Sequence, residues 1–345
     1  MKGFLRSVLP FLAGAPVLAV IQWAMPPGYA LIAVAMGVNV VLAVSLNVVN
    51  GFTGQFSLGH AGFMAVGAYT AAKVTLALEG VKLAFVPEVV SDQLVFAVAL
   101  AAGMVTAAIA GLLVGMPSLR LRGDYLAIVT LGFGEIIRSI IENLKTLGQA
   151  TGLSGLPPRT NLVWVGISAI ATVVMARRLA VSTEGRALFA IREDEIAAEA
   201  MGVDTTGYKV KAFAIAAAYA GLAGGLIVHA ILLATPRMFT FIRSIEVVVM
   251  VVLGGLGSVT GSVVAACLLT VALEALREFE SYRMVLYALL LVVLMLVRPQ
   301  GLFGTRELWD LPLLRRLPRP RRLAAESAGA SPTDVRGETG PGGRA

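Results

Sequence analysis

Long apolar runs recur along almost the whole chain, and they restrict what it can fold into. A transmembrane α-helix needs about 20 predominantly apolar residues to cross the hydrocarbon core of a bilayer. Runs near that length occupy residues 8–25, 29–49, 60–79, 93–115, 124–143, 162–176, 210–234, 245–277 and 284–298. Only 14% of the residues are charged, against about 25% in a typical soluble domain. We therefore predict an all-α polytopic membrane protein.

The run at 245–277 is too long for a single crossing helix. At ~1.5 Å per residue it would measure roughly 50 Å, whereas the hydrocarbon core is about 30 Å thick. Its centre carries the glycine cluster GGLGSVTG at 254–261. Backbone that is not helical is tolerated at membrane depth where it is buried in protein or lines a wet cavity. We predict two shorter helices separated by a break at this cluster.

The distribution of basic residues predicts the topology, because Lys and Arg accumulate in short cytoplasmic loops. Lys2 and Arg6 place the amino end in the cytoplasm, and the basic run 315–322 does the same for the carboxyl end. If both ends lie on one side of the membrane, the number of crossings must be even. Dividing the run at 245–277 into two helices gives about ten crossings. A cleaved signal peptide is the alternative for 8–25; we favour a retained span, since no small-residue cleavage pattern closes that run.

A densely charged loop at 177–211 separates two apolar runs, and the same parity places it in the cytoplasm. Within it, apolar residues recur at helical spacing at Ala187, Ile191, Ala198 and Met201. We predict one amphipathic helix over 184–202, ended by Gly202. It is interpreted as a docking surface, the alternative being a solvated helix without a partner. The candidate coupling residues are Glu184, Gly185, Arg186, Arg192, Glu193, Glu195, Glu199 and Gly202.

A second glycine-broken connector, GFTGQFSLGHAG at 51–62, contains no charged residue and is preceded by polar side chains within an apolar run. Paired glycine-interrupted segments in the two halves of a transporter indicate a translocation path. The predicted pathway residues are Asn47, Asn50, Gln55, Ser57, His60, Gly254, Gly255 and Ser258. The alternative is that these residues only hold helices together.

Few ionisable residues lie inside the predicted spans. We expect Arg138 to pair with Glu135 or Glu142, which share its helix face, with Lys145 as another partner for Glu142. His229 is expected to be an interhelical hydrogen-bond partner rather than a proton relay.

The usual signatures of catalysis are missing from the sequence. It has two histidines and one cysteine, without metal-ligand spacing, and it lacks the G-x-x-x-x-G-K-[ST] loop that cradles nucleotide phosphates. We predict that the chain is not an enzyme, binds no cofactor or metal, and depends on another chain if ATP drives its work. Its net charge of +7 is dispersed over loops and tail, which argues against nucleic acid as a partner.

Four ordered motifs carry a family resemblance: NVVNGFTGQFSLGHAGF at 47–63, LRLRGDYLAIVTLGFGE at 119–135, GRALFAIREDEIAAEAMGV at 185–203 and VRPQGLFG at 297–304. Over residues 30–304 the chain resembles the branched-chain amino acid permeases of ATP-binding cassette (ABC) importers, and within them the LivM-type subunit. The resemblance implies a bacterial inner-membrane protein that imports leucine, isoleucine or valine. Related permeases carry urea, short amides or other amino acids, and a stand-alone secondary carrier is a further alternative.

The resemblance also implies partners and a domain organisation. A second related permease subunit, two cytoplasmic ATPase subunits and a periplasmic substrate-binding protein are expected, with 184–202 as the coupling helix seated on the ATPase. Residues 1–304 would form the transmembrane permease domain. Residues 305–345 are rich in Pro, Gly and Arg, and we predict a disordered cytoplasmic tail whose basic run contacts membrane lipid or serves as a topology anchor.

Overall fold

The computed structural model describes residues 26–79, 88–119, 121 and 123–276, together with single residues between 285 and 304. The chain divides into two compact units, Met1–Glu307 and Leu308–Ala345, and the account below concerns the first. The span predicted at 8–25, most of the run at 284–298 and the tail at 305–345 lie outside the described residues.

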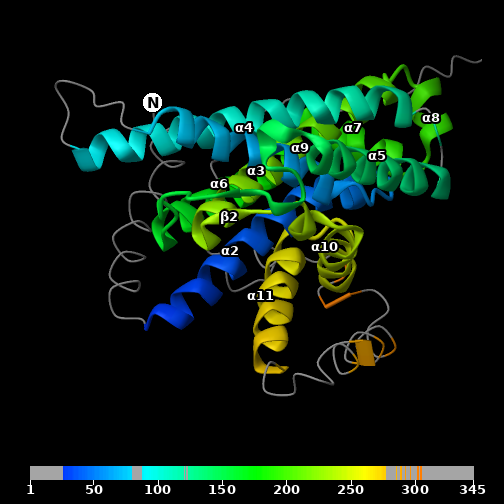
Figure 1. Cartoon of the computed structure of the whole chain (residues 1–345). Coiled ribbons are helices and arrows are strands. Elements are labelled where there is room, and N and C mark those ends of the chain that lie inside the picture. The colour runs from blue at the N-terminus through cyan, green and yellow to red at the C-terminus, as the bar shows by residue number, and fades with distance from the viewer. Residues whose placement is uncertain are drawn as a thin grey trace, which may run out of the picture. The chain divides into compact units, whose positions relative to one another are not determined.

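The described part of the chain is almost entirely helical (Figure 1), as predicted. Its α-helices are α2 (Pro27–Asn47), α3 (His60–Ala77), α4 (Glu88–Ser118), α5 (Asp124–Asn143), α6 (Leu162–Val181), α7 (Thr183–Glu193), α8 (Glu195–Ala200), α9 (Thr205–Ile231), α10 (Phe241–Gly254) and α11 (Val259–Ala275). A π-helical turn, η1 (Val48–Phe52), extends α2. Short 3-10 turns occur at η2 (Lys145–Leu147), η3 (Gln149–Thr151) and η4 (Pro236–Phe239). Strands β1 (Leu153–Ser154) and β2 (Leu233–Ala234) pair antiparallel, with Leu153 opposite Ala234.

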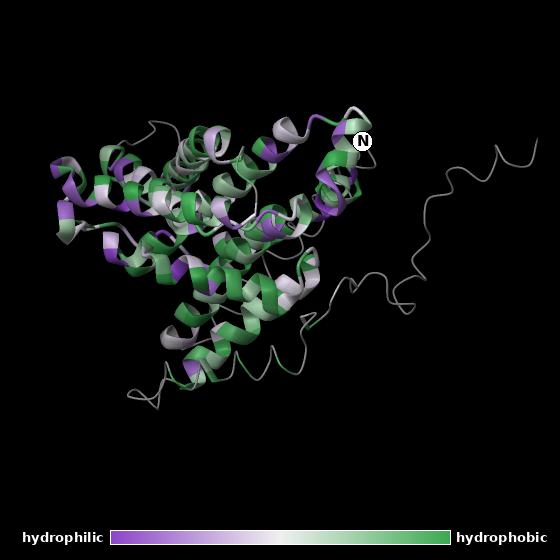
Figure 2. Cartoon of the chain, turned by 90° about the vertical axis from the view of Figure 1, so that its right-hand side faces the viewer, coloured by the Kyte–Doolittle hydropathy of each residue, from purple (hydrophilic) through white to green (hydrophobic). Residues whose placement is uncertain are grey.

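Hydrophobic residues follow the length of most helices (Figure 2). By length and composition, 4 described helical segments are able to cross a membrane, namely Gly28–Phe52, Val90–Ser118, Leu162–Val181 and Thr205–Ile231. Other predicted spans are shorter or more polar: α10 and α11 have 14 and 17 residues, and α5 carries Glu135, Arg138 and Glu142. The break between α10 and α11 confirms the predicted split, since α10 ends at Gly254 and α11 begins at Val259.

The core of the helical assembly is formed by α3, α4 and α9, which pack on one another more extensively than any other described helices. Their backbones approach closely because glycines face one another. A Cβ atom on Gly67 of α3 would lie 2.1 Å from the Cα of Gly221 in α9, and one on Gly103 of α4 would lie 2.7 Å from the Gly67 carbonyl. Small residues allow this packing, which drives helix association in lipid.

Polar side chains inside this core satisfy one another. Fully buried His229 of α9 contacts the Gly225 carbonyl through Nδ1 at 2.8 Å and the Thr75 hydroxyl of α3 through Nε2 at 3.0 Å. The expected role of His229 as an interhelical hydrogen-bond partner is therefore confirmed.

On α5, outside this core, Arg138 pairs with Glu135 at 2.7 Å and with Glu142 at 3.0 Å, as predicted.

Helix α2 runs through the assembly and contacts α6, α9, α10 and α11. In the most apolar 18-residue stretch of each helix, 72% is buried for α2, 33% for α4 and 28% for α6. The outer faces of α4 and α6 are consequently open to lipid or to another chain, whereas α2 and its π-turn are enclosed. This enclosed end of α2 is where the first glycine break begins.

Candidate functional site: the glycine breaks and the coupling segment

The two glycine breaks lie in direct contact although more than 200 residues separate them in the sequence. Asn47, in the last turn of α2, joins them: its Oδ1 accepts a hydrogen bond from the Gly257 N–H at 2.9 Å, and its Nδ2 donates to the Ser258 carbonyl at 3.0 Å. A Cβ on Gly51 would lie 2.4 Å from the Gly257 nitrogen. Glycine is therefore required where the breaks cross.

The other predicted pathway residues gather around this crossing. The Ser57 N–H donates to Asn50 Oδ1 at 3.2 Å, and Ser45 Oγ lies 3.0 Å from His60 Nε2. Gly254 packs against the backbone of Gly261, and Gly255 adopts a φ of 105°. The predicted polar side chains are all buried, namely Asn47, Asn50, Gln55, Ser57, His60 and Ser258. Gln55 also lines a cavity.

The coupling segment, residues 183–202, is not the single helix that the sequence predicts. Helix α7 ends at Glu193, and Asp194 adopts extended backbone with φ −156° and ψ 110°. Its Oδ1 accepts hydrogen bonds from the Ile196 and Ala197 N–H groups and so caps a new helix, α8. An aspartate offers the backbone this alternative to a continuous helix. The predicted end holds, since Gly202 follows α8 with a φ of 83°.

Three candidate coupling residues point toward the body of the permease. Arg192 Nη1 donates to the Gly51 carbonyl of the first break at 2.8 Å, and the Leu256 carbonyl of the second break lies 3.5 Å away. Glu195 pairs with the buried Lys209 of α9 at 2.7 Å, and Glu199 accepts a hydrogen bond from Thr205 Oγ1 at 2.7 Å. These links seat the coupling segment on both breaks and on α9.

The remaining candidates hold or shape the segment itself. Buried Gly185 is required, because a Cβ there would lie 1.9 Å from the Leu179 carbonyl. Glu184 lies in the first turn of α7, where its charge complements the helix dipole. Exposed Arg186 donates to the Val181 carbonyl at 3.3 Å. Glu193 lines the same cavity as Gln55.

The outer face of the coupling segment is apolar and exposed. Ile196 is 68% exposed and Met201 84% exposed, whereas Ile191 and Ala198 of the predicted apolar face are buried. The segment therefore presents two large apolar side chains among its exposed acidic residues.

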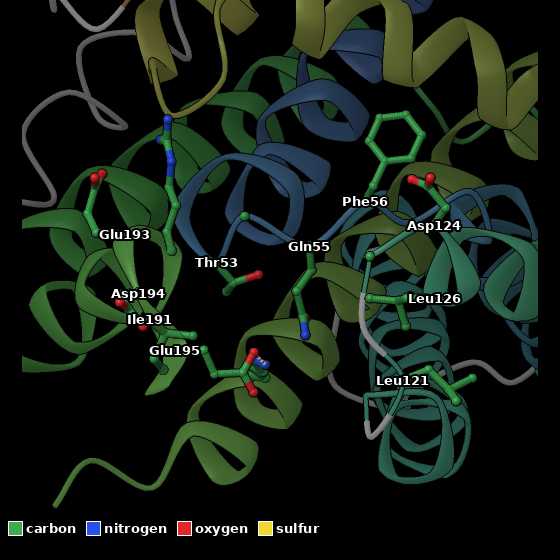
Figure 3. Close-up of a pocket in the computed structure, with 14 residues that line it drawn as sticks. Thr53, Gln55, Phe56, Leu121, Asp124, Leu126, Ile191, Glu193, Asp194 and Glu195 are labelled. Carbon is green, nitrogen blue, oxygen red and sulfur yellow. Dashed lines mark ion pairs between the residues drawn. The ribbon is translucent and has the colours of Figure 1, made fainter. Parts of the chain in front are cut away.

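A cavity of about 380 Å³ lies between the first break, the start of α5 and the coupling segment. Its walls include 53–56, Asp124 and Leu126, and 191–195. Figure 3 shows Gln55 projecting between Glu195 and the leucines of the opposite wall, with the Lys209–Glu195 ion pair dashed. The cavity therefore adjoins both the first break and the coupling segment.

One polar network was missed by the sequence analysis. Arg243 of α10 pairs with Glu246 at 2.8 Å and donates to Asn39 Oδ1 of α2, while Asn39 Nδ2 donates to Thr270 of α11 at 2.8 Å. Asn39 and Arg243 are each visible as polar residues in apolar runs. Their pairing across 204 residues is visible only in the fold.

Buried polar contacts between apolar, partly exposed helices define a multi-pass helical membrane protein. The family model described as "Branched-chain amino acid transport system / permease component" matches residues 28–296. The chain belongs to this family of transport permeases.

Individual relatives agree with the family match. The high-affinity branched-chain amino acid transport system permease protein LivM of Salmonella typhimurium (strain LT2) is 38% identical over 300 residues, which cover 77% of this chain and 67% of that protein. The LivM protein of Escherichia coli (strain K12) is 37% identical with the same coverage. The LivH protein of Salmonella typhimurium is 30% identical over 149 residues, or 42% of this chain and 47% of that protein. No solved structure matches.

Proposed function

We propose that this permease is the membrane-spanning subunit of an ABC importer that carries leucine, isoleucine and valine across the bacterial inner membrane. The match over residues 28–296 and the names of the relatives support this substrate class. The chain is proposed to be non-enzymatic and free of cofactors, with both ends in the cytoplasm. ATP is bound and hydrolysed by other subunits.

The proposed partners are a second related permease, two cytoplasmic ATPase subunits and a periplasmic binding protein. Two exposed surfaces support these assignments. The outer faces of α4 and α6 are apolar and largely uncovered, as a permease partner and lipid require. Ile196 and Met201 offer the ATPase an apolar contact on the coupling segment.

The contact between Arg192 and the two breaks is the observation that best supports the mechanism. When ATPase closure displaces the coupling segment, the Arg192 guanidinium transmits the displacement to the Gly51 and Leu256 carbonyls, because it is bonded to the first and close to the second. The aromatic contact of Phe189 with Phe52, at 5.0 Å between ring centroids, couples α7 to the π-turn as well. Both breaks then reorient together, and alternating access follows.

Replacing Arg192 tests this mechanism. In the complete transporter reconstituted in liposomes, Arg192→Ala should lower ATP-driven leucine uptake at least tenfold, while ATP hydrolysis continues, because the ATPase contact lies on the other face. Arg237→Ala is the matched control, since exposed Arg237 lies in η4, outside the coupling segment and both breaks. Equal uptake by the two variants would contradict the mechanism.

Omitting the ATPase subunits tests the transporter class. Leucine uptake should fall to background, whereas uptake that persists would identify a stand-alone carrier. Competition by urea, short amides and other amino acids against leucine then sets the substrate class.

A further inference from the structure

The cavity of about 380 Å³ beside the coupling segment is lined by Arg192 and by the neighbouring part of the first break. Its size falls within the range of about 300–1,000 Å³ that small-molecule sites occupy. The 191–195 wall places it at the end of the permease where the ATPase would dock. A solute in this cavity would thus be reached from the ATPase side.

Gln55 shows that the cavity is equipped for a polar ligand. The residue is only 8% exposed and lines the cavity, and Figure 3 shows its side-chain nitrogen projecting into the open space. A ligand carboxylate would accept a hydrogen bond from this amide N–H.

The charges in the walls select a particular kind of ligand. Lys209 and Glu195 form a 2.7 Å ion pair with the lysine side chain 4% exposed. A simple cation or anion would compete for one partner and leave the other charge buried and unpaired, which is strongly unfavourable. A zwitterion inserts between them without that cost, its carboxylate facing Lys209 and its ammonium facing Glu195. Asp124, also in the wall, adds attraction for the ammonium.

Apolar side chains complete the match. Leu126 is 1% exposed and Ile191 is 4% exposed, and both contribute to the walls. We propose that the cavity binds a free α-amino acid with an apolar side chain from the cytoplasmic side. The proposal rests on the function proposed above, because it takes the imported product as the ligand.

Occupancy of the cavity would regulate transport. The first break at 53–56 and the coupling segment at 191–195 form the wall that moves in the proposed relay, and Asp124 and Leu126 of α5 form the facing wall. A ligand bonded to both walls opposes their relative movement, which the import cycle requires. Accumulated product therefore slows its own import.

The test uses the complete transporter in liposomes, with the ATPase side facing inward and ATP and unlabelled leucine trapped inside. We expect trapped leucine to inhibit the initial uptake of labelled leucine. Asp124→Asn, which removes a wall charge without touching the breaks, should raise the trapped concentration needed for half-inhibition about tenfold. Tyr125→Phe is the matched control, because the neighbouring Tyr125 is 72% exposed and is not part of the walls.

A second measurement does not depend on uptake. Equilibrium binding of labelled leucine to the purified complex without its binding protein should weaken about tenfold in Gln55→Leu. The inference is overturned if trapped leucine has no effect, if Asp124→Asn behaves as the control, or if Gln55→Leu binds leucine normally. Absent uptake with nothing trapped inside would instead contradict the proposed function.

Discussion

Single side chains hold the two glycine breaks of this permease in register. Asn47 uses both ends of its amide, one for the Gly257 N–H and one for the Ser258 carbonyl. The Gly257 N–H lies in irregular backbone, whereas the Ser258 carbonyl also accepts hydrogen bonds from the N–H and hydroxyl of Ser262 in α11. Asn47, which we predict to lie beside the pathway, thus also positions the two breaks.

Replacing Asn47 should therefore destabilise the fold. Asn47→Leu removes the buried amide that binds the Gly257 N–H, while the Ser258 carbonyl keeps its bonds from Ser262, and we expect a loss of roughly 1–3 kcal/mol. Thermal unfolding of the purified permease in detergent measures it. Asn143→Leu is the control: Asn143 is exposed and donates only within α5 among its recorded bonds, so its midpoint should stay near wild type. Similar midpoints for both variants would show that the amide bridge is unimportant.

At the scale of the helix, the sequence predicted well where most helices lie along the chain and poorly which elements contact one another. Apolar runs gave the approximate spans of α2 to α6 and α9, and run length, the glycine cluster and the even number of crossings predicted the break at 254–261. The interruption at Asp194 was missed because the apolar spacing around it continues through the break. Lys209–Glu195 and Arg243–Asn39 were missed because each joins elements that the fold alone brings together.

Glycine packing between α3, α4 and α9 gives a prediction at this scale. Gly67→Ala places a Cβ 2.1 Å from the Gly221 Cα, so α3 and α9 must separate; we expect destabilisation of about 1–3 kcal/mol. Gly132→Ala is matched in chemistry but sits in α5 with no atom within 4 Å of the new Cβ, and it should stabilise by up to ~1 kcal/mol. Denaturant titration measures the free energy of unfolding of both variants. An unchanged free energy in Gly67→Ala would mean that the helices do not interlock there.

For the molecule as a whole, orientation in the membrane is the central expectation. Helix α6 lies between exposed Ser154 of β1 and the coupling segment that contains Met201. It has 20 residues, which correspond to about 30 Å of helix. The proposed topology puts Ser154 outside and Met201 in the cytoplasm.

Cysteine labelling checks this orientation, since the chain has one native cysteine, Cys267. In a Cys267→Ala background, Ser154→Cys should react with an impermeant maleimide in right-side-out vesicles and Met201→Cys only in inside-out ones. The reverse pattern would place the ATPase contact on the wrong side and refute the proposed coupling.

The seat of Arg192 also has a consequence for how the protein is made. The Leu256 carbonyl beside it belongs to a residue synthesised 64 positions later. While α7 and α8 are being synthesised, this second carbonyl does not yet exist, and the seat is completed only after α10 has been made. In the complex that we propose, an ATPase that recognises the seated segment would therefore bind only chains that extend past α10.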